Sequence, residues 1–346
     1  MQRNSVSPRT AVDAAADQER LIEVVDLAVH FRLLQGTLRA VDGVSFDIRR
    51  GRTLGVVGES GCGKSVTAQS IMRLLPSPPA YVAGGQIVFH RAVSDATVDL
   101  AALNPRGAEM RSIRGGEIAM IFQEPMTSLT PAYTIGMQIM EAITLHQAVD
   151  RHEARSRALE MLDLVGMPQP ERTVDSYPHE LSGGMMQRAM IATALSCRPS
   201  LLIADEPTTA LDVTTAATIL ELMEQLQAEY GMAIMHITHN LGVIAEVADD
   251  VVVMYLGKIV ERADVDTLFY APAHPYTRGL LNSVPRIGSQ EPLVPIRGVV
   301  PEPDAVPPGC HFGPRCPQRI AGVCTRVAPP LVAVGPGHDV LCHLYA

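Results

Sequence analysis

The segment Gly58–Ser65 reads GESGCGKS and fits the spacing G-x-x-x-x-G-K-[ST]. It lies between the apolar run TLGVVG and the helical stretch SVTAQSIMRLL, and this required context disfavours the alternative of a chance Gly-rich turn. Glycines let successive backbone N–H groups surround phosphate oxygens, and a helix N-terminus adds partial positive charge. Lys64 is expected to reach the β- and γ-phosphates, and Ser65 to ligate Mg²⁺. The sequence therefore predicts a nucleoside triphosphate site formed by Gly58, Glu59, Ser60, Gly61, Cys62, Gly63, Lys64, Ser65 and Val66.

An acidic pair follows a second apolar run. The stretch LLIADEP, residues 201–207, would deliver Asp205 and Glu206 at the carboxyl end of a buried strand, where ligands bind in open α/β sheets. Asp205 would hold Mg²⁺, directly or through water, and Glu206 would act as the general base on an attacking water. An acidic pair in this position is also typical of a helix cap or turn. The upstream phosphate loop favours the catalytic interpretation.

A second Gly-containing segment, LSGGMMQR at residues 181–188, could simply begin a helix with Ser182 as its N-cap. The same geometry can bind phosphate, through the Ser182 hydroxyl and the N–H groups of Gly183 and Gly184. The segment resembles the signature LSGGQ of ABC ATPases, with Met185 in place of Gln. In that family the signature contacts the γ-phosphate of ATP bound by the other ATPase subunit.

The resemblance to ABC ATPases assigns roles to further residues. Gln123 matches the glutamine that senses Mg²⁺ and the transmembrane partner, and His239 matches the histidine that contacts the γ-phosphate. Ala210, Leu211 and Asp212 match the loop that couples two ATP sites. The resemblance implies two such subunits packed head to tail, with ATP and Mg²⁺ between each phosphate loop and the other subunit's signature.

The aromatic residue that stacks on adenine in this family has no direct match here. Leu38 and Arg39 occupy the usual place, shortly before the segment AVDGVSF, and Phe31 lies further back. Either adenine packs against an aliphatic side chain and an arginine stem, or Phe31 provides the contact. Both interpretations stay open.

The pattern of strands and helices predicts the elements that position these residues. Short β segments with Gly-containing turns occupy residues 21–57, and strand–helix units follow, which predicts a mostly parallel α/β sheet. We expect the P-loop NTPase fold of an ABC cassette, with a parallel core sheet, an antiparallel β subdomain, a helical subdomain and a small Cys-containing tail. The expected boundaries are a disordered leader at 1–20, an ATPase domain at 21–284 with its helical subdomain at 124–181, and a C-terminal region at 285–346.

Four longer segments resemble the ATPases of oligopeptide and dipeptide importers, namely EPMTSLTPAYTIGMQIMEAI, SYPHELSGGM, EPTTALDVT and AHPYTRGLL. This resemblance covers nearly the whole chain from residue 21. It implies ATP hydrolysis that powers peptide import, together with two transmembrane permease subunits and an extracytoplasmic substrate-binding protein. The second ATPase would be a related subunit or a second copy of this chain.

The C-terminal region contains four of the six cysteines, Cys310, Cys316, Cys324 and Cys342, spaced C-x5-C-x7-C-x17-C. Four thiolates can bind one Zn²⁺ or a [4Fe–4S] cluster, and the lack of a C-x2-C pair argues against an ordinary zinc ribbon. The tail resembles the C-terminal region of peptide-importer ATPases, where four cysteines imply an iron–sulfur cluster. Zinc and free thiols remain the alternatives.

Composition excludes several classes of protein. A net charge of −9 argues against a general nucleic-acid binder, and no apolar run approaches the roughly 18–20 residues of a membrane-spanning helix. The N-terminus lacks a basic region followed by an apolar run, so we expect no secretory signal. The expected location is the cytoplasmic side of the cell membrane, reached through partner subunits.

Other functions remain as alternatives. A related importer of nickel, glutathione or an oligosaccharide would use a similar ATPase, because substrate contacts belong to other subunits. A soluble ABC ATPase acting on DNA or ribosomes would usually contain a coiled-coil insertion or two cassettes, which this chain lacks. A metal-binding regulator with a vestigial cassette is disfavoured by the presence of Lys64, Asp205, Glu206 and His239.

Overall fold

The computed structural model describes residues 19–91, 96–123, 128–209, 211–284, 295–301 and 306–346. Most of the predicted leader, the first four residues of the predicted helical subdomain and Ala210 lie outside these ranges. Within them, no helix combines the length and the apolar character needed to cross a bilayer.

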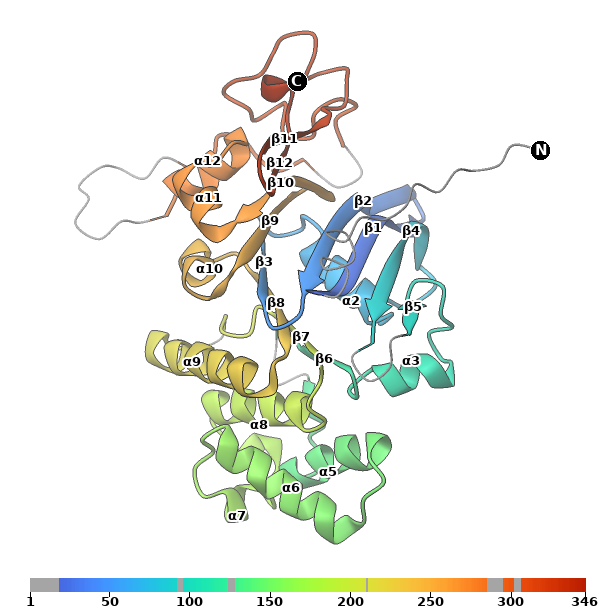
Figure 1. The fold of residues 1–346 in the computed structure, drawn as a ribbon, viewed down its shortest axis with the longest axis vertical. Helices are drawn as coiled ribbons and strands as arrows, with labels where there is room; N and C mark the ends of the chain where they lie inside the picture. Colours follow the sequence, from blue (N-terminus) through green and yellow to red (C-terminus); the bar gives the residue numbers. More distant parts are fainter. Residues whose placement is uncertain (1–18, 92–95, 124–127, 210, 285–294, 302–305) are drawn as a thin grey trace.

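An eight-stranded sheet forms the centre of the fold (Figure 1), in the order β11-β12-β10-β9-β3-β8-β7-β6. The pairs among β9, β3, β8, β7 and β6 are parallel, as the alternating strand–helix pattern predicted. Because parallel strands end at one edge of a sheet, the residues that follow β3, β6, β7 and β8 meet there. These strands are β3 (Thr53–Val57), β6 (Ile118–Ile121), β7 (Leu201–Asp205), β8 (Ala233–Thr238) and β9 (Asp250–Tyr255).

A second sheet is antiparallel, with the order β2-β1-β4-β5. It corresponds to the predicted antiparallel β subdomain and packs over α2 (Lys64–Ile71) through a shared apolar cluster that contains Val29, Phe46 and Ile71. Its strands are β1 (Arg20–Leu33), β2 (Gly36–Arg49), β4 (Ala80–His90) and β5 (Thr97–Asp99), and α3 (Ala108–Ile113) follows them.

A group of helices lies beyond the β6 edge of the main sheet (Figure 1). Residues 135–164 contain two helices, because the chain leaves the helical conformation at Gln147 and Asp150 caps the next helix by accepting the Glu153 N–H at 2.9 Å. Ser182 caps α8 in the same way. The group comprises α5 (Ile135–His146), α6 (Arg151–Leu164), α7 (Pro170–Thr173), the 3₁₀ turn η1 (Pro178–Glu180) and α8 (Gly183–Leu195).

The C-terminal residues extend the main sheet. Strand β12 (His338–Leu341) pairs antiparallel with β10 (Lys258–Asp264), and β11 (Leu331–Gly335) pairs with β12. Phe312, Cys310 and Cys324 also join the apolar cluster of Tyr255 and Tyr276. The C-terminal segment thus packs into the core that surrounds Tyr255 and Tyr276. The remaining elements are α9 (Val213–Tyr230), α10 (Leu241–Val247), α11 (Val265–Tyr270), α12 (Pro275–Asn282) and η2 (His343–Tyr345).

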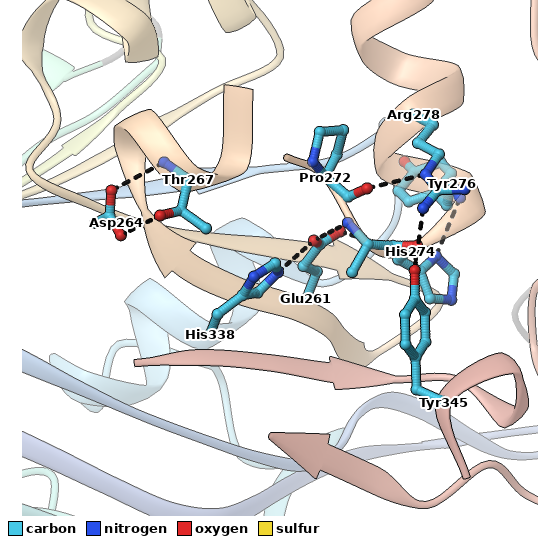
Figure 2. Close-up of polar contacts among 10 residues, drawn as sticks. Glu261, Asp264, Thr267, Pro272, His274, Tyr276, Arg278, His338 and Tyr345 are labelled. Atoms are coloured by element: carbon cyan, nitrogen blue, oxygen red, sulfur yellow. Dashed lines mark hydrogen bonds and ion pairs between the residues drawn. The ribbon is translucent and has the colours of Figure 1, made fainter. Parts of the chain in front are cut away.

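The buried carboxylate of Glu261 forms hydrogen bonds with several of these C-terminal elements (Figure 2). Glu261 of β10 is fully buried, and it accepts the backbone N–H groups of Ala273 at 2.5 Å and His274 at 2.9 Å. Its Oε1 lies 2.8 Å from Nε2 of His338 on β12. A buried carboxylate is stable only when it has such partners, so Glu261 holds β10, the start of α12 and the tail in one arrangement.

Candidate active site

The phosphate loop follows β3 and ends at α2, as the motif predicted. Gly58 and Gly63 have φ values of 154° and 105°, which L side chains rarely adopt. A Cβ added at Gly58 would lie 2.3 Å from the carbonyl oxygen of Met254, and one at Gly63 would lie 2.5 Å from that of Ala40. The close backbone contacts explain why glycine is required at both positions.

Lys64 and Ser65 begin α2 within this loop. The Lys64 side chain is buried, and its Nζ donates to the carbonyl oxygens of Gly58 at 2.7 Å and Glu59 at 3.1 Å. Cys62 is also buried, which raises the pKa of its thiol. Ser60 and Gly61 are exposed at the tip of the loop, and Val66 packs partly against the core.

Asp205 ends β7 beside Ser65, and the Ser65 hydroxyl donates to its carboxylate at 3.1 Å. Burial raises the pKa of Asp205 above its ordinary value, and the hydrogen bond from Ser65 opposes this rise. A hydroxyl and a carboxylate are the oxygen donors that Mg²⁺ prefers, and a buried carboxylate is stabilised by a bound cation. This pair therefore fits Mg²⁺.

Glu206 is the centre of a hydrogen-bond network. Its Oε2 accepts from Nε2 of Gln123 at 3.0 Å and from the hydroxyl of Thr209 at 2.9 Å. Its Oε1 lies 3.2 Å from Nδ1 of His239. The structure thus brings together Gln123, Glu206 and His239, which come from the ends of three parallel strands.

The backbone conformation and the charge of Glu206 are both defined in the structure. Its φ of 50° lies in the left-handed region, and its N–H donates to the carbonyl oxygen of Ile237 at 2.9 Å. Burial raises the pKa of Glu206, but the hydrogen bonds with His239 and Thr209 outweigh it, and the pKa lies below its usual value. Glu206 is therefore ionised at neutral pH, as a general base requires.

The second predicted phosphate cradle lies on α8. Ser182 and Gly183 are exposed, and a Cβ added at Gly183 would meet no atom within 4 Å. The Ser182 hydroxyl accepts the N–H of Met185 at 3.4 Å. Across the described part of the chain, no hydrogen bond joins Ser182, Gly183 or Gly184 to the phosphate loop. This cradle faces outward from its own subunit.

The structure also shows the contacts of the predicted coupling loop and of the candidate adenine-contact residues. Asp212 caps α9 and accepts the N–H of Thr215 at 3.0 Å, whereas Leu211 packs partly against the helical core. Phe31 and Leu38 are paired across β1 and β2, so their side chains share one face of that sheet, and Arg39 is paired with His30 instead. The residue that contacts adenine stays a prediction.

Sequence reasoning missed three residues that contact site residues. Thr209 binds Glu206, the Tyr276 hydroxyl accepts the N–H of Glu59 at 2.9 Å, and Arg315 forms an ion pair with Glu59 at 2.6 Å. Thr209 lies within the recognised segment EPTTALDVT, so its proximity to Glu206 was a usable signal. The contacts of Tyr276 and Arg315 depend on tertiary packing and have no local signal.

The four C-terminal cysteines do not form the predicted metal site in this structure. Burial raises the pKa of Cys310 to about 11 and that of Cys316 above its usual value, and the nearby thiols of Cys324 and Cys342 add to both shifts. The N–H of Cys310 donates to the carbonyl oxygen of Cys324 at 2.8 Å, and Cys316 packs in the same apolar cluster. However, among the described residues no group of three or more His, Cys, Asp or Glu side chains is arranged to hold a metal ion. The donor chemistry suits an iron–sulfur cluster, but the observed arrangement does not support one.

The chain is similar to known proteins over most of its length. A model of the ABC transporter family matches residues 41–209, and a model described as the oligopeptide/dipeptide transporter C-terminal region matches residues 260–324. A Sinorhizobium fredii protein named "Probable peptide ABC transporter ATP-binding protein" is 53% identical over 93% of this chain and 94% of its own length. The dipeptide transport ATP-binding protein DppD of Bacillus subtilis is 50% identical over 94% and 95%, respectively.

Solved structures show the same fold. A dimeric ATP-binding cassette in a post-hydrolysis state, bound to ADP and Pi, superposes with a TM-score of 0.62 at 25% identity, and the match covers 71% of this chain and 99% of that one. The expected ABC cassette fold is therefore confirmed. These relatives are about 50% identical to the chain over almost its full length. The chain therefore belongs to the ATP-hydrolysing subunits of ABC transporters, in the branch that has the oligopeptide/dipeptide transporter C-terminal region.

Proposed function

We propose that this chain binds Mg–ATP at Gly58–Ser65 and hydrolyses it with Glu206 as the general base, and that this reaction powers the import of oligopeptides or dipeptides. The observation that supports the assignment best is the position of the Glu206 carboxylate. It is ionised, held by Gln123, Thr209 and His239, and adjoins the Ser65–Asp205 pair in sequence and at one sheet edge.

Each residue has a defined task in this mechanism. Backbone N–H groups of the phosphate loop and the Lys64 ammonium bind the β- and γ-phosphates. Ser65, Asp205 and Gln123 would hold Mg²⁺, which supplies positive charge to the phosphate oxygens. Glu206 accepts a proton from the attacking water, and His239 orients the carboxylate and contacts the γ-phosphate.

The site is completed by a second ATPase subunit. Ser182 and Gly183 are open to solvent on their own subunit, so we assign the Ser182–Gly184 cradle to the γ-phosphate of ATP on the partner, which is a related subunit or a second copy of this chain. The dimeric state of the similar cassette bound to ADP and Pi supports this assignment.

In the proposed assembly, two permease subunits receive the motion of the helices α5–α8, and an extracytoplasmic binding protein delivers the peptide. The chain would then lie on the cytoplasmic face of the cell membrane. The names of the relatives, a dipeptide and an oligopeptide transport ATP-binding protein of Bacillus subtilis among them, support peptides over nickel, glutathione or other solutes. They also favour a transporter over a soluble ABC ATPase, and no nucleic-acid partner is proposed.

The four cysteines remain a separate proposal. A [4Fe–4S] cluster on Cys310, Cys316, Cys324 and Cys342, or zinc as the alternative, is supported by their number and proximity and opposed by their arrangement. Iron and acid-labile sulfide in the anaerobically purified chain decide the question. No step of hydrolysis depends on such a group.

The assignment of the base can be tested by Glu206→Gln. We expect ATP turnover to fall by about 10²–10³-fold, because the amide cannot accept the proton. The dissociation constant for Mg–ATP should change less than about threefold, since Glu206 does not bind phosphate. Turnover is measured by phosphate release and binding by fluorescence of a labelled ATP analogue. Glu246→Gln, on an exposed position of α10, is the matched control. Normal turnover in Glu206→Gln would contradict the assignment.

A further inference from the structure

An ion pair joins the C-terminal region to the phosphate loop. Glu59 is the second residue of that loop, and Arg315 lies between Cys310 and Cys316, 256 residues further along the chain. Two parallel contacts link the side chains, Nη1 to Oε2 at 2.6 Å and Nη2 to Oε1 at 3.0 Å. Bidentate pairs of this kind are the strong and directional class of ionic hydrogen bond.

Arg315 is fixed in place by other contacts as well. Its side chain is only 4% exposed, its Nε donates to the carbonyl oxygen of Arg297 at 3.1 Å, and its Nη1 lies 3.4 Å from the hydroxyl of Tyr255. The ring of Tyr255 packs against those of Tyr276 and Phe312, with centroids 4.7 and 5.3 Å away. The hydrogen bonds with Glu59 keep the pKa of Arg315 above its usual value. The guanidinium is therefore a rigid, permanently charged support for Glu59.

The backbone of Glu59, whose side chain is held by Arg315, also contacts Lys64. The Glu59 carbonyl oxygen accepts from Nζ of Lys64 at 3.1 Å, and the Glu59 N–H donates to the hydroxyl of Tyr276 on α12 at 2.9 Å. A shift of Glu59 would move the lysine and the adjacent N–H groups. Two contacts restrain Glu59 from outside the loop: Tyr276 lies on α12, and Arg315 lies in the C-terminal region.

Charge gives the pair a second role. A free carboxylate in a phosphate-binding loop would repel the triphosphate. Arg315 neutralises it with a guanidinium that is only 4% exposed, whereas the Glu59 side chain is 28% exposed. The pair is therefore partly shielded from screening by solvent.

We propose that Arg315 is a positioning residue for ATP binding, which holds and neutralises Glu59 so that the C-terminal region forms part of the nucleotide site. The inference rests on the proposed role of Gly58–Ser65 in binding phosphate. It does not depend on a metal at the four cysteines.

The test is a double-mutant cycle on the full chain, with Mg–ATP affinity measured by fluorescence of a labelled analogue. Arg315→Ala should raise the dissociation constant about tenfold, because Glu59 is left charged and unsupported. Glu59→Gln should raise it less than about threefold, and adding Arg315→Ala to Glu59→Gln should change it less than about twofold. In steady state, Arg315→Ala should raise KM for ATP by a similar factor and leave kcat within about threefold.

Controls separate this role from general stability. Asp339→Asn removes the 2.7 Å ion pair between Arg262 and Asp339, which also joins the tail to the body but does not contact Glu59. That variant should bind ATP like the wild type. If Arg315→Ala fails to fold, Arg315→Gln takes its place, because it removes the charge and keeps a polar side chain; unfolding temperatures are recorded for every variant.

The outcomes are distinct. Wild-type affinity in the Arg315 variants, or an equal loss in the presence and absence of Glu59→Gln, would overturn the inference. Lys64→Ala separates the two proposals. If Lys64→Ala loses binding while Arg315→Ala binds normally, only the role of Arg315 fails. Normal binding by Lys64→Ala would remove the proposed function and this inference with it.

Discussion

The loops at the starts of α2 and α8 use the same chemistry in opposite surroundings. Both present backbone N–H groups at a helix N-terminus together with small residues. Gly58 and Gly63 are buried against backbone carbonyl oxygens, and Lys64 is buried between them. Gly183 has open space around it, and Ser182 is exposed. On the proposed function, the loop that binds ATP within its own subunit is rigidly packed, whereas the loop that contacts the partner's ATP is exposed.

The largest effect expected from this contrast is that of Gly63→Ala. The added Cβ would lie 2.5 Å from the Ala40 carbonyl oxygen at a φ of 105°. We expect a loss of about 2–3 kcal/mol in the free energy of unfolding. Mg–ATP affinity should fall about 100-fold, because the N–H groups of the loop shift. Denaturant titration and analogue fluorescence measure the two quantities.

Gly183→Ala is the matched variant on α8. Because space is open there, its unfolding free energy should stay within about 0.5 kcal/mol of the wild type. Equal destabilisation by Gly63→Ala and Gly183→Ala would show that the two loops do not differ in packing.

A smaller effect on the free energy of unfolding is expected at Asp205, beside the phosphate loop. The pKa of Asp205 is raised by burial, so the folded state without Mg²⁺ is weakened by its negative charge at neutral pH. Asp205→Asn should raise the free energy of unfolding of the nucleotide-free chain by about 1 kcal/mol. The difference should be smallest below the ordinary pKa of an aspartate, grow between that value and the raised pKa of Asp205, and stay constant above it. Thermal unfolding across this pH range checks the sign, and a less stable Asn variant at neutral pH would contradict it.

How far the sequence predicted the structure depended on how local the contacts are. The phosphate loop, the Ser65–Asp205 contact and the grouping of Gln123, Glu206 and His239 follow from motifs at the ends of parallel strands. The parallel core sheet and the antiparallel β subdomain also agree with the predicted cassette.

Other features arise only when distant segments pack. The pairing of β12 with β10 and the contact of Arg315 with Glu59 join segments 77 and 256 residues apart, and neither leaves a local pattern. The spacing of the four cysteines predicted a metal site, but the arrangement of the described side chains does not support one. Sequence spacing alone did not predict how these side chains pack.

If the phosphate loop and the α8 loop contact nucleotides bound to different subunits, Gly183→Glu should affect only the assembled transporter. The open space accommodates the side chain, while its negative charge would oppose a partner's γ-phosphate. ATP affinity of the isolated chain and ATP turnover of the assembled transporter are measured with the same variant. We predict unchanged affinity within about twofold and a fall in turnover of about 100-fold. Reduced affinity in the isolated chain, or normal turnover in the assembly, would contradict the account.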